Sequence, residues 1–148
     1  MSRGFALIGL YNPKTPANVG SVMRACGVYG AAGAIYTGKR YKKAAKFVTD
    51  PQKNFRHIPL TWVEDLRDAI PYGCVPVAVD LIEGATALPG YKHPERAFYI
   101  FGPEDGTLGS KVTDWCRDVV YVPGNMCMNL AATANVILYD RMAKRGQS

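Results

Sequence analysis

The sequence contains no apolar run near the roughly 20 residues that a membrane-spanning helix needs. It has only two histidines, and its four cysteines form no Cys-x-x-Cys pair, so no zinc or other metal site is expected. A Gly-x-Gly-x-x-Gly motif after the first expected strand and a Walker loop are both missing, which disfavours the common dinucleotide and ATP sites. With no secretory segment at the start, reduced thiols are expected, and we predict a cytoplasmic protein without a membrane anchor.

Positive charge is concentrated in one segment. The formal net charge is +6, and residues 39–57 hold seven Lys and Arg against Asp50 alone, so the rest of the chain is neutral. Such a segment is the footprint expected of a protein that binds a polyanion such as RNA. The alternative is a merely solvated surface loop. The predicted RNA contacts are Lys39, Arg40, Lys42, Lys43, Lys46 and Arg56.

Strand and helix patterns alternate along the chain. Short apolar runs indicate buried strands, and apolar residues three or four apart indicate helices; at residues 61–70 a Thr61-x-x-Glu64 capping box supports a helix start. This alternation predicts an α/β fold with a parallel sheet flanked by helices, in a single domain over residues 1–148. The expected strands are 5–11, 34–37, 75–81, 97–101 and 119–122, and the expected helices are 18–29, 44–48, 61–70, 110–116 and 129–144.

Three loops next to these strands hold most of the Asn, Gly and Pro residues: 12–24, 102–109 and 123–129. In open α/β sheets, ligands bind at the carboxyl ends of the strands. In the third loop, Asn129 is placed to cap the last helix, which leaves free N–H groups beside a strand end. An ordinary strand-to-helix turn would show the same pattern.

Together, the three loops resemble the signature motifs of the SPOUT superfamily, specifically its SpoU/TrmH-type RNA 2'-O-ribose methyltransferases. The resemblance spans almost the whole chain in the right order. It implies an α/β fold with a deep C-terminal trefoil knot, an exception to the rule that chains do not thread loops. It also implies methylation of a ribose 2'-hydroxyl, in tRNA or else in ribosomal RNA, by a homodimer. The matching residues are Asn18 and Arg24; Phe101-Gly102-Pro103-Glu104 with Gly106 and Gly109; and Cys127-Met128-Asn129-Leu130.

The resemblance further implies S-adenosyl-L-methionine as the cofactor, held mainly by backbone groups. Backbone recognition is physically reasonable, because the adenine edge needs paired N–H and C=O groups and glycines let the chain approach closely. Carried over to this sequence, the expected cofactor contacts are Asp80, Leu81, Gly102, Glu104, Val122, Cys127, Asn129 and Leu130.

Arg24 is the residue that we expect to act in catalysis. At 100° per residue it lies off the apolar stripe of its helix, although a solvated surface arginine would do the same. The resemblance implies that it helps to activate the ribose hydroxyl near a two-fold interface. Neutralising a guanidinium near pH 7 would cost roughly 8 kcal/mol, so binding a phosphate and stabilising a developing alkoxide is the cheaper role. Asn18, Glu104 and Asn129 are the other expected catalytic-site residues, each also placed to cap or neutralise a helix start.

One departure from the resemblance concerns the third motif. Relatives usually have serine where Cys127 stands and another small polar residue where Ala131 stands, and a thiol is a poor hydrogen-bond partner. This keeps open an alternative, a non-catalytic RNA-binding module on the same fold. The final helix offers small residues for close packing, either within its own subunit or against a second copy.

Overall fold

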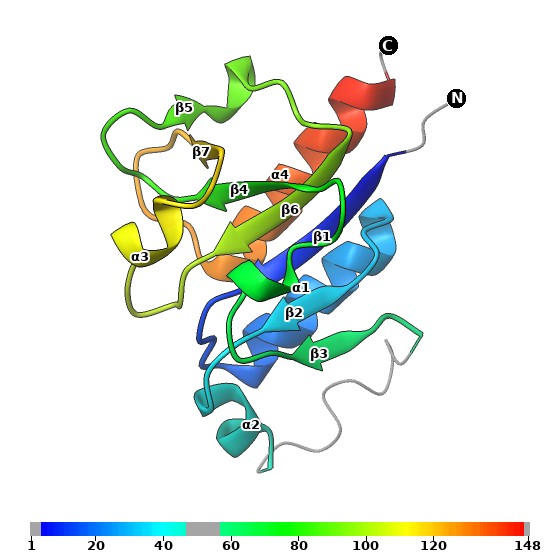
Figure 1. Cartoon of the computed structure of the whole chain (residues 1–148), viewed down its shortest axis with the longest axis vertical. Helices are drawn as coiled ribbons and strands as arrows, with labels where there is room; N and C mark the ends of the chain where they lie inside the picture. Colours follow the sequence, from blue (N-terminus) through cyan, green and yellow to red (C-terminus); the bar gives the residue numbers. More distant parts are fainter. Residues whose placement is uncertain (1–3, 47–56, 147–148) are drawn as a thin grey trace.

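The computed structural model describes residues 4–46 and 57–146. They form a seven-stranded sheet in the order β3-β2-β1-β6-β4-β7-β5, with every neighbouring pair parallel (Figure 1). The predicted parallel α/β sheet is therefore confirmed. Since all strands run the same way, their carboxyl ends share one edge, here called the carboxyl edge. The strands are β1 Phe5–Leu10, β2 Ala34–Tyr36, β3 Leu60–Trp62, β4 Val75–Val79, β5 Thr86–Ala87, β6 Arg96–Phe101 and β7 Asp118–Tyr121.

Both faces of the sheet are covered, which explains the nearly continuous apolar runs of the central strands. Along β6, side chains alternate between two cores: Tyr99 and Phe101 pack into one, and Phe98 and Ile100 into the other. Gly9 on neighbouring β1 makes room for this packing, because a Cβ there would lie 2.9 Å from the Phe98 ring.

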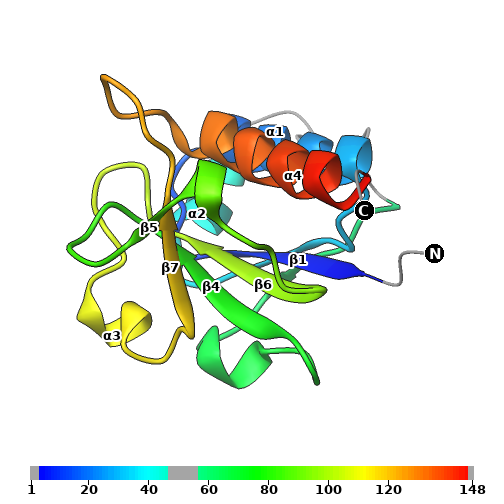
Figure 2. The ribbon, with the colours of Figure 1, turned by 90° about the horizontal axis from the view of Figure 1, so that it is seen from above.

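Two long helices, α1 Pro16–Tyr29 and α4 Leu130–Gly146, lie side by side on one face of the sheet (Figure 2). The opposite face is covered by shorter elements, the 3-10 turn η2 Arg67–Ala69 and the helix α3 Ser110–Thr113. The remaining short elements are α2 Arg40–Ala45 and the 3-10 turn η3 Leu88–Gly90. Within the described residues, no helix combines the length and apolar character needed to cross a bilayer.

The helix expected over residues 61–70 is wrong. Residues 60–62 form the edge strand β3, in which Leu60 pairs with Ala34 and Trp62 with Tyr36, and helical structure is limited to the η2 turn. Backbone pairing with a strand far along the chain outweighs a local capping pattern. Between the expected strands 75–81 and 97–101, where the sequence predicts no helix or strand, lie β5 and the η3 turn.

Two helix starts also differ from expectation. The first helix begins at Pro16, a residue suited to the first helical position, so Asn18 lies inside the first turn and Thr15 is the N-cap. The helix expected over 44–48 lies earlier, as α2, whose Tyr41 is buried at 4% exposure. Residues 47 and 48 of that expected helix are outside the described residues.

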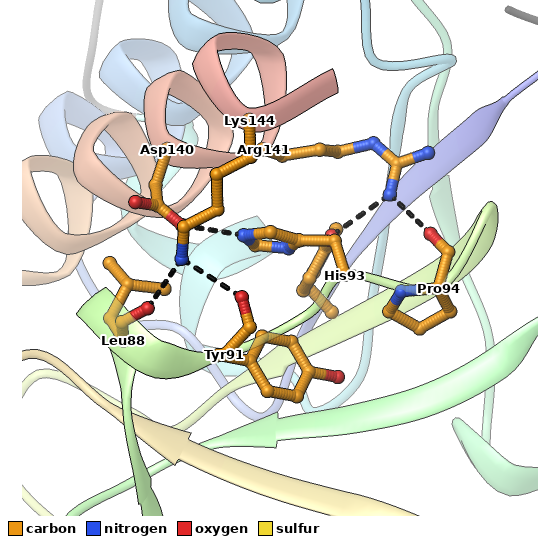
Figure 3. Close-up of polar contacts among 8 residues, drawn as sticks. Leu88, Tyr91, His93, Pro94, Asp140, Arg141 and Lys144 are labelled. Carbon is orange, nitrogen blue, oxygen red and sulfur yellow. Dashed lines mark hydrogen bonds and ion pairs between the residues drawn. The ribbon is translucent and has the colours of Figure 1, made fainter. Parts of the chain in front are cut away.

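A polar cluster ties the C-terminal half of α4 to the opposite, amino edge of the sheet (Figure 3). We call its five side chains the clasp: His93, Tyr99, Asp140, Arg141 and Lys144. Arg141 is only 6% exposed. It donates hydrogen bonds to the carbonyls of Pro94 (2.7 Å), Glu95 (2.6 Å) and Phe5 (3.4 Å). Lys144 donates to the carbonyls of Leu88 (2.6 Å) and Tyr91 (2.9 Å) and pairs with Asp140 at 2.8 Å.

His93 is the centre of the clasp, with its side chain 2% exposed. Its Nε2 lies 2.7 Å from Asp140 Oδ2 and its Nδ1 2.7 Å from the Tyr99 hydroxyl, which also accepts from Arg141 at 3.1 Å. Burial lowers the pKa of His93, and Asp140 only partly opposes this. The hydrogen-bond pattern therefore assigns a neutral ring that donates from Nε2 to Asp140 and accepts the Tyr99 O–H at Nδ1.

Candidate functional site

The loops that the sequence singled out meet at the carboxyl edge. Residues 11–15 follow β1, 102–109 follow β6, 80–85 follow β4, and 122–129 follow β7. These four strands are successive neighbours in the sheet, and neighbouring strands lie about 4.8 Å apart. Four loops from distant parts of the chain therefore lie side by side.

Glu104 joins the second loop to the start of α1. Its carboxylate accepts the backbone N–H groups of Lys14 at 3.0 Å and Thr15 at 2.8 Å, and the side-chain amide of Asn18 at 3.3 Å. Partial burial by itself would raise the pKa of Glu104, but these donors outweigh it and hold the pKa below its ordinary value. The structure thus brings together two of the predicted site residues, Asn18 and an ionised Glu104.

Arg40 joins the same loops to α2. Its guanidinium forms two hydrogen bonds to Asp105, at 2.8 and 3.1 Å, and a third to the Asn12 carbonyl at 2.7 Å. The bond from Arg40 holds the pKa of Asp105 below its usual range. Arg40 therefore positions loops within the chain, while its expected contact with RNA stays a prediction.

The loop after β4 contains an unsatisfied carboxylate oxygen. Asp80 Oδ1 accepts the Leu81 N–H at 2.9 Å, whereas the buried Oδ2 has no hydrogen-bond partner among the described residues. An unpaired buried oxygen is costly, so this atom suits a donor from a bound ligand. Exposed apolar side chains surround the same edge, with Leu81 73% and Met126 87% exposed and Ile82 and Met128 also open to solvent. A polar acceptor among exposed apolar groups is typical of a ligand site.

The loop after β7 leads into α4 through Asn129. The Asn129 Oδ1 accepts the Ala132 N–H at 2.7 Å, which confirms the predicted N-cap. Cys127 is exposed, Val122 is half-buried, and the Leu130 side chain lies in the core, so Leu130 has only its backbone to offer a ligand.

Gly102 lies in the neighbouring loop after β6. A Cβ there would lie 3.1 Å from the backbone nitrogen of Leu108, so the loop folds closely over this residue. The tight backbone explains why glycine stands at a position expected to contact the cofactor.

Arg24 lies apart from the other predicted catalytic residues. It is exposed on α1, off the buried stripe, and forms no hydrogen bond or ion pair with any residue that the structure describes. It comes eight residues after Pro16, or about 12 Å along the helix from its first residue. The exposed apolar side chains on α1 and α4 include Val28, Tyr139 and Met142.

The predicted RNA contacts divide into three groups. Arg40 is engaged within the chain, as described above, and Arg56 lies outside the described residues. The third group consists of lysines that are exposed on α2 and at its two ends: Lys39, Lys42, Lys43 and Lys46. Trp62 lies next to these lysines, and the sequence does not indicate it as a binding residue because residues 61–70 carry the pattern of a helix. In residues 4–46 and 57–146, no group of three or more His, Cys, Asp or Glu could hold a metal.

Proteins with an open parallel α/β sheet bind their ligands at the carboxyl edge of that sheet. This chain has such a sheet, with its glycine-rich and polar loops at that edge, and so falls in this class. This chain belongs to the SpoU rRNA Methylase family, whose model matches residues 6–139. The match confirms the resemblance drawn from the three loops. Among curated proteins, no sequence matched this chain significantly.

Solved structures of this fold include the SpoU methyltransferase AviRb from Streptomyces viridochromogenes in complex with AdoMet (TM-score 0.79, 21% identity, 100% of this chain and 63% of that chain). The A. aeolicus TrmH/SpoU tRNA modifying enzyme aligns with a TM-score of 0.82 at 15% identity over 99% of this chain and 78% of that one. A third structure, from work on the 2-OH methylation of C/U34 on tRNA, aligns with a TM-score of 0.77 at 20% identity over 98% and 99% of the two chains. At these identities the likeness is one of fold, and this chain spans about three fifths of the AviRb length.

Proposed function

We propose that this protein transfers a methyl group from S-adenosyl-L-methionine to a ribose 2'-hydroxyl of RNA, with tRNA as the first substrate to test and ribosomal RNA as the second. The family match over residues 6–139 carries the proposal. The AdoMet complex of AviRb supports the cofactor. The relative studied for 2-OH methylation on tRNA supports the acceptor, because nearly its entire length, 99%, is covered by this chain.

The cofactor fits the loops after β4, β6 and β7. When bound, it supplies a methyl group on a positively charged sulfur. The unpaired Asp80 Oδ2 would accept a hydrogen bond from one of its hydroxyl or ammonium groups. The exposed side chains of Leu81 and Met126 would cover its adenine, and Gly102, Val122 and residues 127–130 would offer backbone groups.

Arg24 is proposed as the catalytic cation. It would bind a phosphate beside the target ribose and stabilise the negative charge on the ribose oxygen as its proton leaves. Asn18 and Glu104 would act as positioning residues, since their contacts fix the second loop against α1. Asn129 would hold the third loop by capping α4.

Arg24 would serve the cofactor site of a second copy. Within one chain it lies about 12 Å along α1 from the loops, and α1 and α4 also expose the large apolar side chains of Val28, Tyr139 and Met142. Exposed apolar side chains on adjacent helices suit a two-fold dimer in which α1 and α4 meet their counterparts. We also propose that residues 1–148 act as one cytoplasmic SPOUT domain with a C-terminal trefoil knot.

Arg24→Ala tests the proposal directly. Transfer of labelled methyl from the cofactor to total RNA should fall by about 100-fold or more, because the charge that stabilises the transition state is removed. Cofactor affinity, measured by calorimetry, should change little. Arg67→Ala, on the opposite face of the sheet and also exposed, is the matched control and should keep full activity.

Two outcomes would contradict the proposal. Full activity in Arg24→Ala would remove Arg24 from catalysis. A wild-type protein that binds RNA but neither binds the cofactor nor transfers methyl would be the non-catalytic module instead. Mapping 2'-O-methyl sites in cells with and without the gene would then identify the acceptor nucleotide.

A further inference from the structure

A pocket of about 320 Å³ opens between α2 and the end of β3. The elements beside it, α2 and β3, lie at the β3 edge of the sheet, away from β5 (Figure 1). Its volume falls within the size range of small-ligand sites. Its charged lining residues are all lysines, and it has one aromatic lining residue. The lining consists of Gly38, Lys39, Lys42, Lys43, Lys46 and Trp62.

The four lysines form one face of a short helix. Their spacing of three and four residues places Lys39, Lys42, Lys43 and Lys46 on the same side of α2, which we call the lysine face. On the other side, Tyr41 is buried and contacts Tyr36 edge to face, with ring centroids 5.1 Å apart. None of the four lysines forms an ion pair with a described residue. Like charges this close destabilise a helix, so an anionic ligand would relieve the repulsion.

Trp62 offers an apolar ring rather than a polar edge. Its indole N–H donates to the Gly38 carbonyl at 2.9 Å, which satisfies the only donor of the side chain. The residue is nevertheless 44% exposed and lines the pocket. Gly38 itself is fixed by a positive φ of 78° and by close contact with Asn12, where a Cβ would clash. The ring is therefore held in place with surface left for stacking.

The pocket is linked to the loops of the candidate site but does not coincide with them. Arg40, adjacent to the lysine face, bonds to Asp105 and to the Asn12 carbonyl. In the sheet order, β3 is three strands from β6, or about 14 Å at 4.8 Å per strand. A ligand that filled both places would have to be an extended polyanion carrying aromatic groups.

We propose that this pocket binds an unpaired nucleotide of the RNA substrate that flanks the methylated one, with its base stacked on Trp62 and its phosphates on the lysine face. The inference rests on the proposed function for the identity of the polyanion. Lysines bind phosphates as flexible point charges, and an aromatic ring stacks on any base, so recognition here would depend little on sequence.

Binding of labelled oligonucleotides tests the stacking. A short oligoadenylate and an abasic strand of equal length carry the same phosphates, so their difference in affinity measures base contact alone. We expect the wild-type protein to bind oligoadenylate about tenfold more tightly than the abasic strand. Trp62→Ala should abolish that difference, whereas Trp62→Phe should keep most of it. Tyr72→Ala, which removes an aromatic ring that is 99% exposed, is the matched control and should change neither affinity.

Charge reversal tests the phosphate contacts separately. Lys42→Glu with Lys43→Glu should weaken binding of both strands and reduce the slope of log affinity against log salt by about 0.7 for each phosphate that the variant no longer binds. Lys92→Glu, an exposed lysine beside the clasp, should leave the slope unchanged. Urea unfolding of each variant checks that it is folded.

Equal affinity of the wild-type protein for the two strands, or a difference that survives in Trp62→Ala, would overturn the stacking and leave a phosphate-only surface. The proposed function is measured independently by calorimetry with the cofactor and by methyl transfer. Trp62-dependent binding without cofactor binding would refute the methyltransferase assignment and support the pocket. Methyl transfer with an RNA KM unchanged in Trp62→Ala would overturn the pocket alone.

Discussion

The polar side chains at the two edges of the sheet differ in how completely their hydrogen bonds are satisfied. At the amino edge, the clasp satisfies both nitrogens of His93 and pairs Arg141 with the backbone carbonyls of Pro94 and Glu95. At the carboxyl edge lie the only two buried side-chain polar atoms that have no partner among the described residues, Arg40 Nε and Asp80 Oδ2. Buried polar groups without a partner are rare in folded proteins. We therefore interpret the clasp as a structural network and the carboxyl edge as a region that binds ligands.

The largest expected effect on stability breaks the clasp. Arg141→Ala removes four hydrogen bonds and leaves the Pro94 carbonyl without its donor, while the Glu95 carbonyl keeps only the N–H of Phe5. We expect the free energy of unfolding to fall by about 3 kcal/mol or more, since each bond to a charged group contributes about 1.5–3 kcal/mol before relaxation. Urea unfolding measures the loss. Arg24→Ala, at an exposed position on the same layer of helices, should change stability by no more than about 0.5 kcal/mol. Equal losses in the two variants would contradict the comparison.

A smaller effect is expected where the carboxyl edge is itself held together. Glu104→Gln keeps the shape of the side chain but replaces one of its two acceptor oxygens with an NH2 donor, which then faces the N–H of either Lys14 or Thr15. Because Glu104 is only partly buried, we expect a loss of about 1 kcal/mol in stability, together with weaker cofactor binding as the loop loosens. Glu95→Gln, at an exposed glutamate on the amino edge, is the control for the loss of a carboxylate. Unchanged cofactor affinity in Glu104→Gln would show that the loop is positioned by other contacts.

The clasp should also make stability depend on pH. Since the pKa of His93 is held below 6.5, the unfolded chain takes up this proton at a higher pH than the folded chain does. The group therefore has no effect above about pH 6.5, and stability falls as the pH drops through that value toward the folded-state pKa. The groups that face the ring are Tyr91, Tyr99, Asp140, Arg141 and Lys144.

Thermal unfolding between about pH 7.5 and about pH 5.5 measures this dependence. His93→Gln should flatten the slope across that range. His57→Gln, which changes an exposed histidine, should retain it. A wild-type slope of the opposite sign would mean that Asp140 dominates and that the folded clasp holds a charged ring.

The sequence predicted those parts of the fold whose signals are local. The apolar run of β6 and the Asn129 cap of α4 depend on residues within a few positions of one another. The helix expected at Thr61 failed because β3 is stabilised by pairing with β2, some 26 residues earlier, as in Ala34 with Leu60. Long-range backbone pairing has no signature in a short window of sequence.

The residues of the candidate site also divide into those with a local signal in the sequence and those that only the fold brings together. The loops were found because Asn, Gly and Pro mark strand ends, and Glu104 lies where the second motif placed it. The clasp was missed because its partners are far apart in sequence, 47 residues in the case of His93 and Asp140. The pocket at Trp62 was missed for the same reason, since only the fold brings β3 beside α2.

The smallest expected effect concerns the exposed thiol at the carboxyl edge. The family resemblance implies a serine where Cys127 stands, and because Cys127 is exposed, Cys127→Ser should alter stability by no more than about 0.5 kcal/mol. If the backbone of residues 127–130 holds the cofactor, the side chain matters little, and methyl transfer should change by less than about threefold, or 0.65 kcal/mol. Steady-state transfer to RNA measures it. A gain of tenfold or more would mean that a hydroxyl at this position contacts the reacting groups, and that cysteine here reduces the activity of an edge otherwise arranged for catalysis.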